Sequence, residues 1–417
     1  MNNQSAAAAA SKSWKRLDGV DLIRGLAILF VLLNHVNMQM IFAHVPYTMG
    51  LPAQLVSSLV WNGQYGVQMF FAVSGFLITA TSIRRWGSLR NLNPRDFYLL
   101  RFARIAPLLL LLLAILSTLH LAHIDNFVIR KKVASLGTAL LAALTFRINL
   151  LEATHGYLPG SWDILWSLSV EEMFYLFFPL ACLLFKRLGV FIAVLTVFVV
   201  LGPFGRTVLT HGNEVWHEYS YLGSMDAIAL GSLTAIILAR VRLRRNALWS
   251  LALIGSGLVL FILMFSIKAA SWGLDKSGLD MTVLAVGTCM LIAVAAETRW
   301  GSPAPFTPLR WLGLRSYEIY LSHMFIVVTI FGIYRRSGKP LQATLAVFLA
   351  VIALAGVLGD LVARFYSEPM NHLIRRLSGD AVRRMGSVTS EGQAPSREPL
   401  TESLIGIRDT NEKSPPG

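Results

Sequence analysis

The sequence has few charged residues and almost no cysteine, and each shortage narrows the class of protein. Only 14% of its 417 residues are Asp, Glu, Lys or Arg, whereas a soluble domain has about 25%. Its two cysteines, Cys182 and Cys289, lie inside apolar runs and can form at most one pair. The nine histidines include one close pair, His120 and His123, with no acidic or thiol partner at metal-site spacing. Neither a disulfide framework nor a metal site is therefore expected.

Apolar residues take the place of the missing charges. They make up 55% of the chain, the mean hydropathy is +0.58, and apolar runs follow one another from residue 20 to residue 366. The net charge of +14 would also suit a nucleic-acid partner. However, the basic residues punctuate the apolar runs, as in proteins whose orientation in a bilayer is set by charge. We therefore expect one membrane domain with a lipid bilayer, and no nucleic acid, as its partner.

Ten apolar segments are long enough to cross a bilayer, which takes about 20 residues. They predict an all-α, polytopic membrane protein with about ten transmembrane helices in one bundle. The expected spans are 20–41, 63–83, 105–121, 165–185, 189–208, 221–238, 248–267, 281–296, 314–333 and 341–361. A further stretch, 136–151, is short and carries Arg147, and a crossing there would invert every later loop. We predict that it is an interfacial or re-entrant helix on the outer side.

The distribution of basic residues predicts how the chain crosses the membrane. With the N-terminus inside, 26 of the 37 Lys and Arg residues fall on the inner side, 10 on the outer side, and Arg24 within the membrane. This bias indicates a multi-pass protein of the cell inner (plasma) membrane with both termini cytoplasmic. Residues 17–377 form the predicted transmembrane domain. Residues 1–16 and the tail, 378–417, which is rich in Ser, Gly, Pro and charge, are predicted to be disordered.

Ionisable residues inside these segments are informative, because a charge within a membrane is costly. The first helix contains "IRGLAILFVLLNHV" (23–36), which carries Arg24 and His35, 11 residues apart. A helix brings the two to within about 20° of one face and about 16 Å apart along its axis. The other polar candidates are Ser74, Glu171, Glu172, Asp226, Glu318, His323 and Asp360. For any one of them alone, a hydrogen bond between helices is the simpler role.

Two arginines mark the start of the third span. In "FYLLRFARIAP", Arg101 and Arg104 are three residues apart and share a helix face. They are either cytoplasmic anchors that fix the topology or a clamp for an anion, since guanidinium groups bind phosphate in a bidentate manner.

The stretch "WDILWSLSVEEMFYLFFP" opens the fourth span with Trp162 and Trp166, which suit the membrane interface. Glu171 follows at a depth expected to match that of His35. A Glu171–His35 pair would orient the imidazole and raise its basicity, whereas a purely structural ion pair is the alternative. Glu172 competes for the role, because adjacent helical residues point about 100° apart.

Taken in order, several motifs resemble the acyltransferase 3 family of membrane acyltransferases. They are Arg24 and His35 at their spacing, "GVQMFFAVSGFLIT" with Ser74 and Gly75, "RFARIAP", "WSLSVEEMFY", "MDAIALGSL" with Asp226, "LGLRSYEIYLSHMFIV" with Tyr320 and His323, and "ARFYSEPMNHLI" with Glu368. The resemblance covers about residues 17–377. The usual "LDGLRG" opening is "VDLIRG" here, and Gln68 stands where many members have an acid. Neither departure touches His35, Arg101 or Arg104.

The resemblance implies an O-acyltransferase of the stand-alone type, without the C-terminal hydrolase-like domain of some members. The acyl group, most often acetyl, would come from cytoplasmic acyl-CoA, a co-substrate rather than a tightly bound cofactor. The acceptor would be a hydroxyl of a glycan or of another extracytoplasmic or lipid-linked molecule. We expect the outer connection, 122–164, to meet a sugar acceptor with Tyr157, Trp162 and Asp163. A transporter or flippase, which also has a buried polar path, and an inactive interaction protein stay open as alternatives.

The chemistry of acyl-CoA then assigns roles to the residues. Its polyanionic head would bind Arg101 and Arg104, helped by Arg24, and its arm would follow the first helix until the thioester reaches His35. There a neutral imidazole can take the proton of the attacking hydroxyl, although an acyl-histidine intermediate stays open. The remaining substrate-binding candidates are Ser74, Asp226, Tyr320 and His323, with Ser74 or a tyrosine as an oxyanion donor.

Overall fold

Helices make up almost all of the described part of the chain. The computed structural model describes residues 17–185, 187–210, 212–265, 271–298 and 301–378, and these contain no strand. Ten helices within these described ranges are long and apolar enough to cross a membrane. They are α2 (Asp18–Phe42), α4 (Gly63–Trp86), α5 (Pro94–Leu121), α9 (Leu165–Leu184), α10 (Leu188–Arg206), α12 (Tyr221–Leu238), α13 (Arg245–Met264), α15 (Leu279–Thr298), α17 (Ser316–Arg336) and α18 (Thr344–Val362). The predicted all-α polytopic fold is confirmed, whereas the predicted disordered ends, 1–16 and all but the first residue of 378–417, lie outside the described residues.

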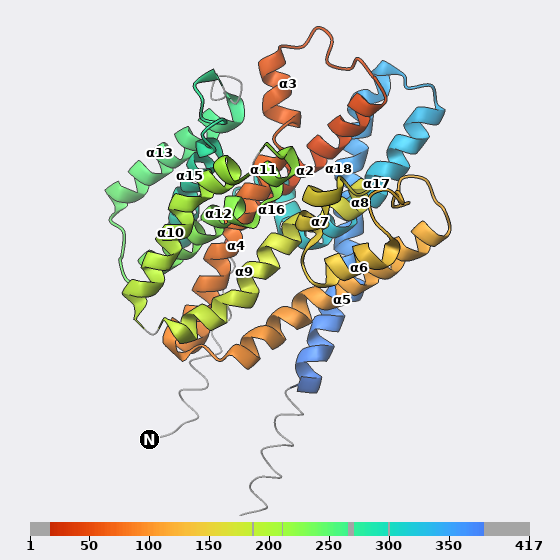
Figure 1. Cartoon of the computed structure of the whole chain (residues 1–417). Coiled ribbons are helices and arrows are strands. Elements are labelled where there is room, and N and C mark those ends of the chain that lie inside the picture. Colours follow the sequence, from red (N-terminus) through yellow and green to blue (C-terminus); the bar gives the residue numbers. More distant parts are fainter. Residues whose placement is uncertain (1–16, 186, 211, 266–270, 299–300, 379–417) are drawn as a thin grey trace, which may run out of the picture. The chain divides into compact units, whose positions relative to one another are not determined.

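Successive long helices run in opposite directions, so the bundle has two ends (Figure 1). We call the end where α2 begins the near face and the end where α2 stops the far face. The short helix α3 (Ala53–Val60) and the connection between α17 and α18 lie at the far face, and the connection between α4 and α5 lies at the near face. The first turns of α2, α5 and α17 are therefore near-face positions, and the last turns of α2 and α17 are far-face positions.

The helices at the centre of the bundle touch backbone to backbone. A Cβ atom at Gly75 of α4 would lie 1.9 Å from the carbonyl oxygen of Ile228, and one at Gly231 of α12 would lie 2.0 Å from that of Ala72. Small residues at such contacts are typical of membrane helices, which gain packing energy from close approach. The contact fixes α4, and with it the helix face that carries Ser74, within the bundle.

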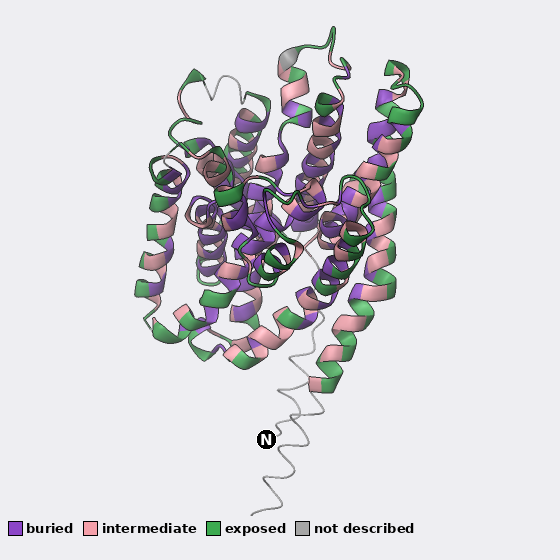
Figure 2. Ribbon diagram, turned by 45° about the vertical axis from the view of Figure 1, so that its right-hand side comes forward, coloured by how far each residue is buried: buried purple, intermediate pink, exposed green. Residues whose placement is uncertain are grey.

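Buried residues lie inside the bundle and exposed ones around its perimeter (Figure 2). Large apolar side chains are among the exposed ones, and Leu253 of α13 and Leu345 of α18 are 78% and 69% exposed. Extended apolar surfaces of this kind mark contact with a membrane or a partner. On helices of membrane-spanning length, they suit lipid tails.

The connection between α5 and α9 does not cross the bundle, as predicted, but it is more deeply buried than expected. It forms three short helices, α6 (Leu136–Leu144), α7 (Ile148–His155) and α8 (Gly160–Asp163). Trp162, expected at the membrane interface, is fully buried, and so are Ile164 and Leu165 at the start of α9. Helix α9 therefore begins within the packed core and not at its surface.

Helix α5 begins well before residue 105, where hydropathy placed the start of the span. The Asn93 side chain caps its N-terminus by accepting backbone N–H hydrogen bonds, and Pro94 occupies the first helical position. Both residue types are favourable at these positions of a helix start. Arg101 and Arg104 consequently lie inside α5, where the helix holds their side chains toward its neighbours.

Candidate active site

A cavity of about 320 Å³ lies between α2, α4, α5, α9 and α17. Six of the nine residues that the sequence predicted for the site line it, namely Arg24, Ser74, Arg101, Arg104, Glu171 and Tyr320. The other three, His35, Asp226 and His323, do not form part of its wall. The fold thus brings most of the predicted residues together from five helices that are far apart in the sequence.

Arg101 lies between two carboxylates and an aromatic ring. Its Nη2 lies 3.4 Å from Oε1 of Glu172 and 4.0 Å from Oε1 of Glu171, and its guanidinium carbon lies 3.5 Å from the centre of the Tyr175 ring. Glu172, which the sequence left open as a partner of His35, is bound here instead. The Nε atom of Arg101 is buried and has no hydrogen-bond partner among the described residues. This donor is suited to an anion that enters the cavity.

The predicted pairing of Glu171 with His35 is wrong. Oε1 of Glu171 accepts hydrogen bonds from the hydroxyls of Ser74 and Tyr175, each at 2.5 Å. The prediction assumed that α9 starts at the outer surface of the bundle. Because α9 begins within the core, its second turn already reaches the level of Arg101, which lies in the near-face half of α5.

The two other arginines of the cavity are also paired. Nη1 of Arg104 lies 3.5 Å from Oε1 of the buried Glu318, and Nη1 of Arg24 lies 3.5 Å from Oδ1 of Asp21. The Arg104 guanidinium also lies over the ring of Tyr317, 5.0 Å from its centre. A guanidinium carries five N–H donors, so one carboxylate positions Arg104 and leaves donors for a second anion. The side chain is therefore held toward the cavity and is more than a surface anchor.

His35 and His323 lie on the far-face side of the cavity. His323 is about one turn beyond Tyr320 on α17, and His35 is about three turns beyond Arg24 on α2. The imidazole rings meet edge to face with centres 4.8 Å apart. Nδ1 of His35 lies 2.8 Å from the carbonyl oxygen of Val31, and Nδ1 of His323 lies 2.7 Å from that of Tyr320. Because a carbonyl oxygen only accepts, both Nδ1 atoms carry the proton and both Nε2 atoms carry the lone pair.

The backbone thus performs the orienting role that was predicted for Glu171. His323 is fully buried, and its Nε2 has no hydrogen-bond partner among the described residues. His35 is half-buried. His35 is therefore the more accessible of the two rings, with His323 packed beside it.

The hydroxyls predicted as oxyanion donors are both occupied by other partners. The hydroxyl of Tyr320 lies 2.6 Å from that of Ser167 and donates to the carbonyl oxygen of Ile164 at 3.0 Å. Ser74 donates to Glu171. Each would have to exchange a bond made in this structure before it bound a developing oxyanion.

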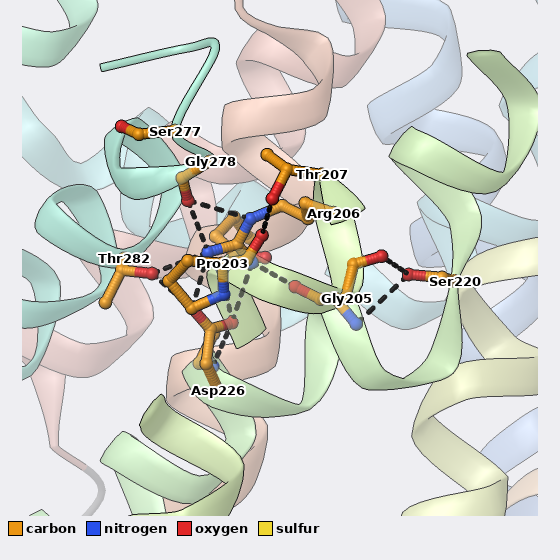
Figure 3. A network of polar contacts seen from close by, with 12 residues as sticks. Pro203, Gly205, Arg206, Thr207, Ser220, Asp226, Ser277, Gly278 and Thr282 are labelled. Atoms are coloured by element: carbon orange, nitrogen blue, oxygen red, sulfur yellow. Dashed lines mark hydrogen bonds and ion pairs between the residues drawn. The ribbon is translucent and has the colours of Figure 1, made fainter. Parts of the chain in front are cut away.

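Asp226 lies outside the cavity, in a buried network with Arg206 (Figure 3). Its carboxylate accepts hydrogen bonds from Nη2 of Arg206 at 2.8 Å, from Nε2 of Gln68 at 3.1 Å and from Oγ1 of Thr282 at 2.6 Å. Arg206 also donates to the carbonyl oxygen of Gly278 at 2.7 Å. These contacts join α4, α10, α12 and α15 and hold Asp226 away from the cavity where a substrate contact was predicted for it. The sequence signal for Arg206 was present, since an arginine in the last turn of an apolar span requires a partner.

The residues expected to meet a sugar acceptor in the connection 122–164 are mostly withdrawn from the surface. Trp162 is fully buried, and Asp163 is half-buried and accepts a hydrogen bond from the hydroxyl of Tyr219 at 3.2 Å. Tyr157, at 51% exposure, is the member of the set that remains accessible. The connection therefore contributes more to the core than to an outer binding surface.

Glu152 in α7 is a buried acid that the sequence analysis missed. It is 1% exposed, and its Oε1 accepts a hydrogen bond from the backbone N–H of Leu158 at 3.0 Å. Burial, reinforced by the nearby Asp163, raises the pKa of Glu152 well above its ordinary value of 4.5. Burial away from water disfavours the charged carboxylate and therefore favours the protonated acid.

We expect the Glu152→Gln variant to be more stable than the wild type at pH 8 and to differ little from it at pH 4. The folded chain keeps a proton that the unfolded chain releases, so the wild type loses stability as the pH rises from about 4.5 through the folded-state pKa. Each tenfold difference in proton affinity is worth about 1.4 kcal/mol. Melting temperatures in detergent between pH 4 and pH 8 measure the effect, with Glu214→Gln as an exposed control. A difference that does not change with pH would contradict it.

The described part of the chain defines the class of protein. It is a multi-pass helical membrane protein whose bundle encloses a cavity lined by paired arginines, with two histidines packed together on the far-face side of that cavity. No group of three or more His, Cys, Asp or Glu residues that could hold a metal ion occurs among the residues placed by the structure. The chain belongs to the acyltransferase 3 family, because the family model, described as an acyltransferase domain, matches residues 17–360. The resemblance seen in the sequence motifs is confirmed.

Curated relatives are found in Staphylococcus aureus. The O-acetyltransferase OatA of strain NCTC 8325 / PS 47 is 25% identical over 381 residues, which cover 86% of this chain and 59% of OatA. OatA of strain COL gives the same values. A further protein of strain COL, SACOL0978, is 24% identical over 379 residues, which cover 86% of this chain and 58% of the relative. The chain spans about three fifths of the length of these relatives, and no solved structure matches it.

Proposed function

We propose that the chain is a membrane O-acyltransferase that moves an acetyl, or another short acyl, group from cytoplasmic acyl-CoA to a hydroxyl of an extracytoplasmic or lipid-linked carbohydrate. The observation that carries the proposal is the order of groups along the helices of the bundle. Arg101 and Arg104 line the cavity, and His35 lies on its far-face side, about 16 Å beyond Arg24 along α2. Acyl-CoA has a matching polarity, with a polyanionic head and a thioester at the end of a long arm. Family membership and the O-acetyltransferase relatives support the same reaction.

His35 acts in this proposal as the general base. Its Nε2 takes the proton of the acceptor hydroxyl while the hydroxyl oxygen attacks the thioester carbonyl carbon. The carbon–sulfur bond then breaks, and the CoA thiolate leaves and recovers the proton from His35. The Val31 carbonyl holds the ring in the tautomer that this step needs. An acyl-histidine intermediate on the same nitrogen would use the same geometry.

The Arg101→Ala and Arg104→Ala variants are expected to raise the KM for acetyl-CoA by about tenfold or more each, with a smaller effect on kcat. A hydrogen bond to a charged group is worth about 1.5–3 kcal/mol, and 1.4 kcal/mol corresponds to a factor of ten. Dephospho-CoA esters should show a smaller loss in whichever variant removes the contact to the missing phosphate. Arg242→Ala is the matched control, because Arg242 also pairs with a carboxylate, at 3.7 Å, but is 86% exposed. Unchanged donor binding in both variants would leave the two arginines as structural residues.

Donor and acceptor are expected to enter from opposite faces of the membrane. Sealed vesicles of known orientation, with labelled acetyl-CoA on the near-face side and a membrane-impermeant oligosaccharide acceptor on the far-face side, should yield acetylated acceptor. A transporter or flippase would move a substrate without forming an acetyl ester. Transfer that occurs only when both substrates are on the near-face side would leave an ordinary inner-face transferase and remove the cross-membrane path.

A further inference from the structure

A second cavity, of about 250 Å³, lies at the far-face ends of α4, α12 and α15, beside α11 (Glu214–Tyr219). Most of the described residues that line it have polar side chains, and the full set is Trp61, Asn62, Gln64, Tyr65, Gln68, Arg206, His217, Glu218, Gly223, Ser224, Asp275, Asp280 and Met281. None of these residues takes part in the proposed transfer step. The space is below the roughly 300–1,000 Å³ of sites for drug-sized ligands, which favours a ligand unit of a single ring.

The inner wall of this far-face cavity is a preformed polar surface. The hydroxyl of Tyr65 donates to Oδ2 of Asp280 at 2.9 Å, and Asp280 is 4% exposed. Gln68 and Ser224 are buried beside them. Arg206 contributes little free charge, because it is bound by Asp226 and by backbone carbonyl groups (Figure 3). The wall therefore offers fixed hydrogen-bonding groups whose positions do not depend on a ligand.

The outer rim combines an aromatic ring with acids. Trp61 is 52% exposed, and Glu218 and Asp275 are exposed. Gln64 donates through Nε2 to the backbone carbonyl of Glu218 at 3.0 Å, which ties α11 to α4 across the rim. A tryptophan beside the opening presents a flat amphipathic surface.

The charge of the far-face cavity selects against anions. Three carboxyl groups face the cavity, those of Glu218, Asp275 and Asp280. The positive charge of Arg206 is matched by the carboxylate of Asp226. His217 is then the remaining basic residue of the described lining. A phosphate or the head of CoA would meet like charge here. Carboxylates and amides are acceptors and donors for hydroxyl groups, so a neutral, hydroxyl-rich ring that lies against Trp61 fits the lining.

The far-face cavity is separated from the first cavity by α4, since Val67, Phe70 and Ser74 line one and Tyr65 and Gln68 line the other. A helix with its side chains is about 10–12 Å across.

The start of α4 is nevertheless level with His35. A Cβ atom at Gly63 would lie 2.5 Å from Nδ2 of Asn34, the residue before His35. To occupy both places, a chain of sugars would have to pass over the first turn of α4, and a single sugar could not reach both.

We propose that the far-face cavity is a subsite that holds one neutral sugar unit of an oligosaccharide acceptor while another unit is presented to His35. The proposal rests on the proposed function in identifying the ligand as part of the acceptor. It assigns recognition of the remote sugar to Trp61, Glu218 and Asp280. The hydroxyl that is acylated lies outside this subsite.

Binding of oligosaccharides without an acyl donor tests the subsite. Purified full-length protein is titrated with N-acetylchitotetraose, cellotetraose and maltotetraose, and saturation-transfer NMR and tryptophan fluorescence are recorded. At least one tetrasaccharide should bind, and Trp61→Ala and Glu218→Gln should each weaken that binding by about tenfold, the equivalent of one good hydrogen bond or ring contact. Trp249→Ala and Glu214→Gln, which alter exposed residues outside the cavity, should bind as the wild type does. The folding of all four variants is checked by melting temperature, since each change is at an exposed position.

The outcomes separate the subsite from the proposed function. A wild type that binds a tetrasaccharide through Trp61 but never forms an acetyl ester removes the proposed function and leaves the subsite. Absence of binding for all three tetrasaccharides overturns the subsite. So does binding that is equal in Trp61→Ala and Trp249→Ala, or binding that is abolished by millimolar choline, which would show a site for cations.

Discussion

The His35→Ala variant is expected to transfer acyl groups about 10²–10⁴-fold more slowly than the wild type, which is the usual contribution of a general base. The expectation rests on the position of the ring beyond the arginine-lined cavity and on its tautomer. Since Nδ1 donates to the Val31 carbonyl at 2.8 Å, the lone pair on Nε2 is available for the acceptor proton. Initial rates with labelled acetyl-CoA measure the loss.

The same variant should fold and insert normally. The described hydrogen bond of His35 is made to the carbonyl of its own helix, four residues earlier, so alanine leaves no partner on another helix unsatisfied. Alanine also has the highest helix propensity. The loss of rate should therefore appear without a loss of protein in the membrane.

A control variant and a rescue experiment test whether the loss of rate in His35→Ala comes from the loss of a base. His155→Ala, at an exposed histidine of α7, should retain full activity, and imidazole added to His35→Ala should restore part of the rate if the missing group is a base. Turnover of His35→Ala near that of the wild type would exclude His35 from the mechanism and direct attention to His323, whose Nε2 is basic but fully buried.

Features that depend on one helix at a time could be predicted from the sequence. Hydropathy places the ten spans because each crossing must be apolar over a fixed length. The spacing of Arg24 and His35, and that of Arg101 and Arg104, is fixed by the helical repeat, and the structure keeps both pairs on the helices assigned to them. Six of the nine candidate residues chosen from the sequence motifs line one cavity in the structure.

Features that depend on how two helices pack against each other could not be predicted from the sequence. The depth of Glu171 is determined by the start of α9, and that start is displaced because Trp162 and its neighbours pack into the core. No periodicity in the sequence reports such a displacement. The same holds for Asp226, whose partner Arg206 comes from the preceding helix at a register that only the folded bundle defines.

The Asp226→Ala variant is expected to lose about 3–5 kcal/mol of stability, the usual cost of breaking a buried ion pair by removing one partner. Asp226 is fully buried and Arg206 is 4% exposed, so the guanidinium would remain in the core without its carboxylate. Gln68 and Thr282 would lose the same acceptor. Most of the variant should fail to accumulate as monodisperse protein, and the folded fraction should unfold at a lower temperature than the wild type.

An ion pair with one exposed member supplies the control for this second prediction. Glu297 pairs with Arg242 at 3.7 Å; the Arg242 side chain is 86% exposed and that of Glu297 is 11% exposed, and solvent around the arginine lowers the contribution of such a pair toward the roughly 0–1 kcal/mol of exposed pairs. Glu297→Ala should therefore leave stability almost unchanged. Replacing both members of the buried pair, as Asp226→Leu with Arg206→Met, should recover part of the stability lost in Asp226→Ala, because no charge is then left unpaired. If Asp226→Ala instead folds like the wild type and raises the KM for acetyl-CoA, Asp226 contacts substrate as the sequence suggested, and the network in Figure 3 is not what holds α10, α12 and α15 together.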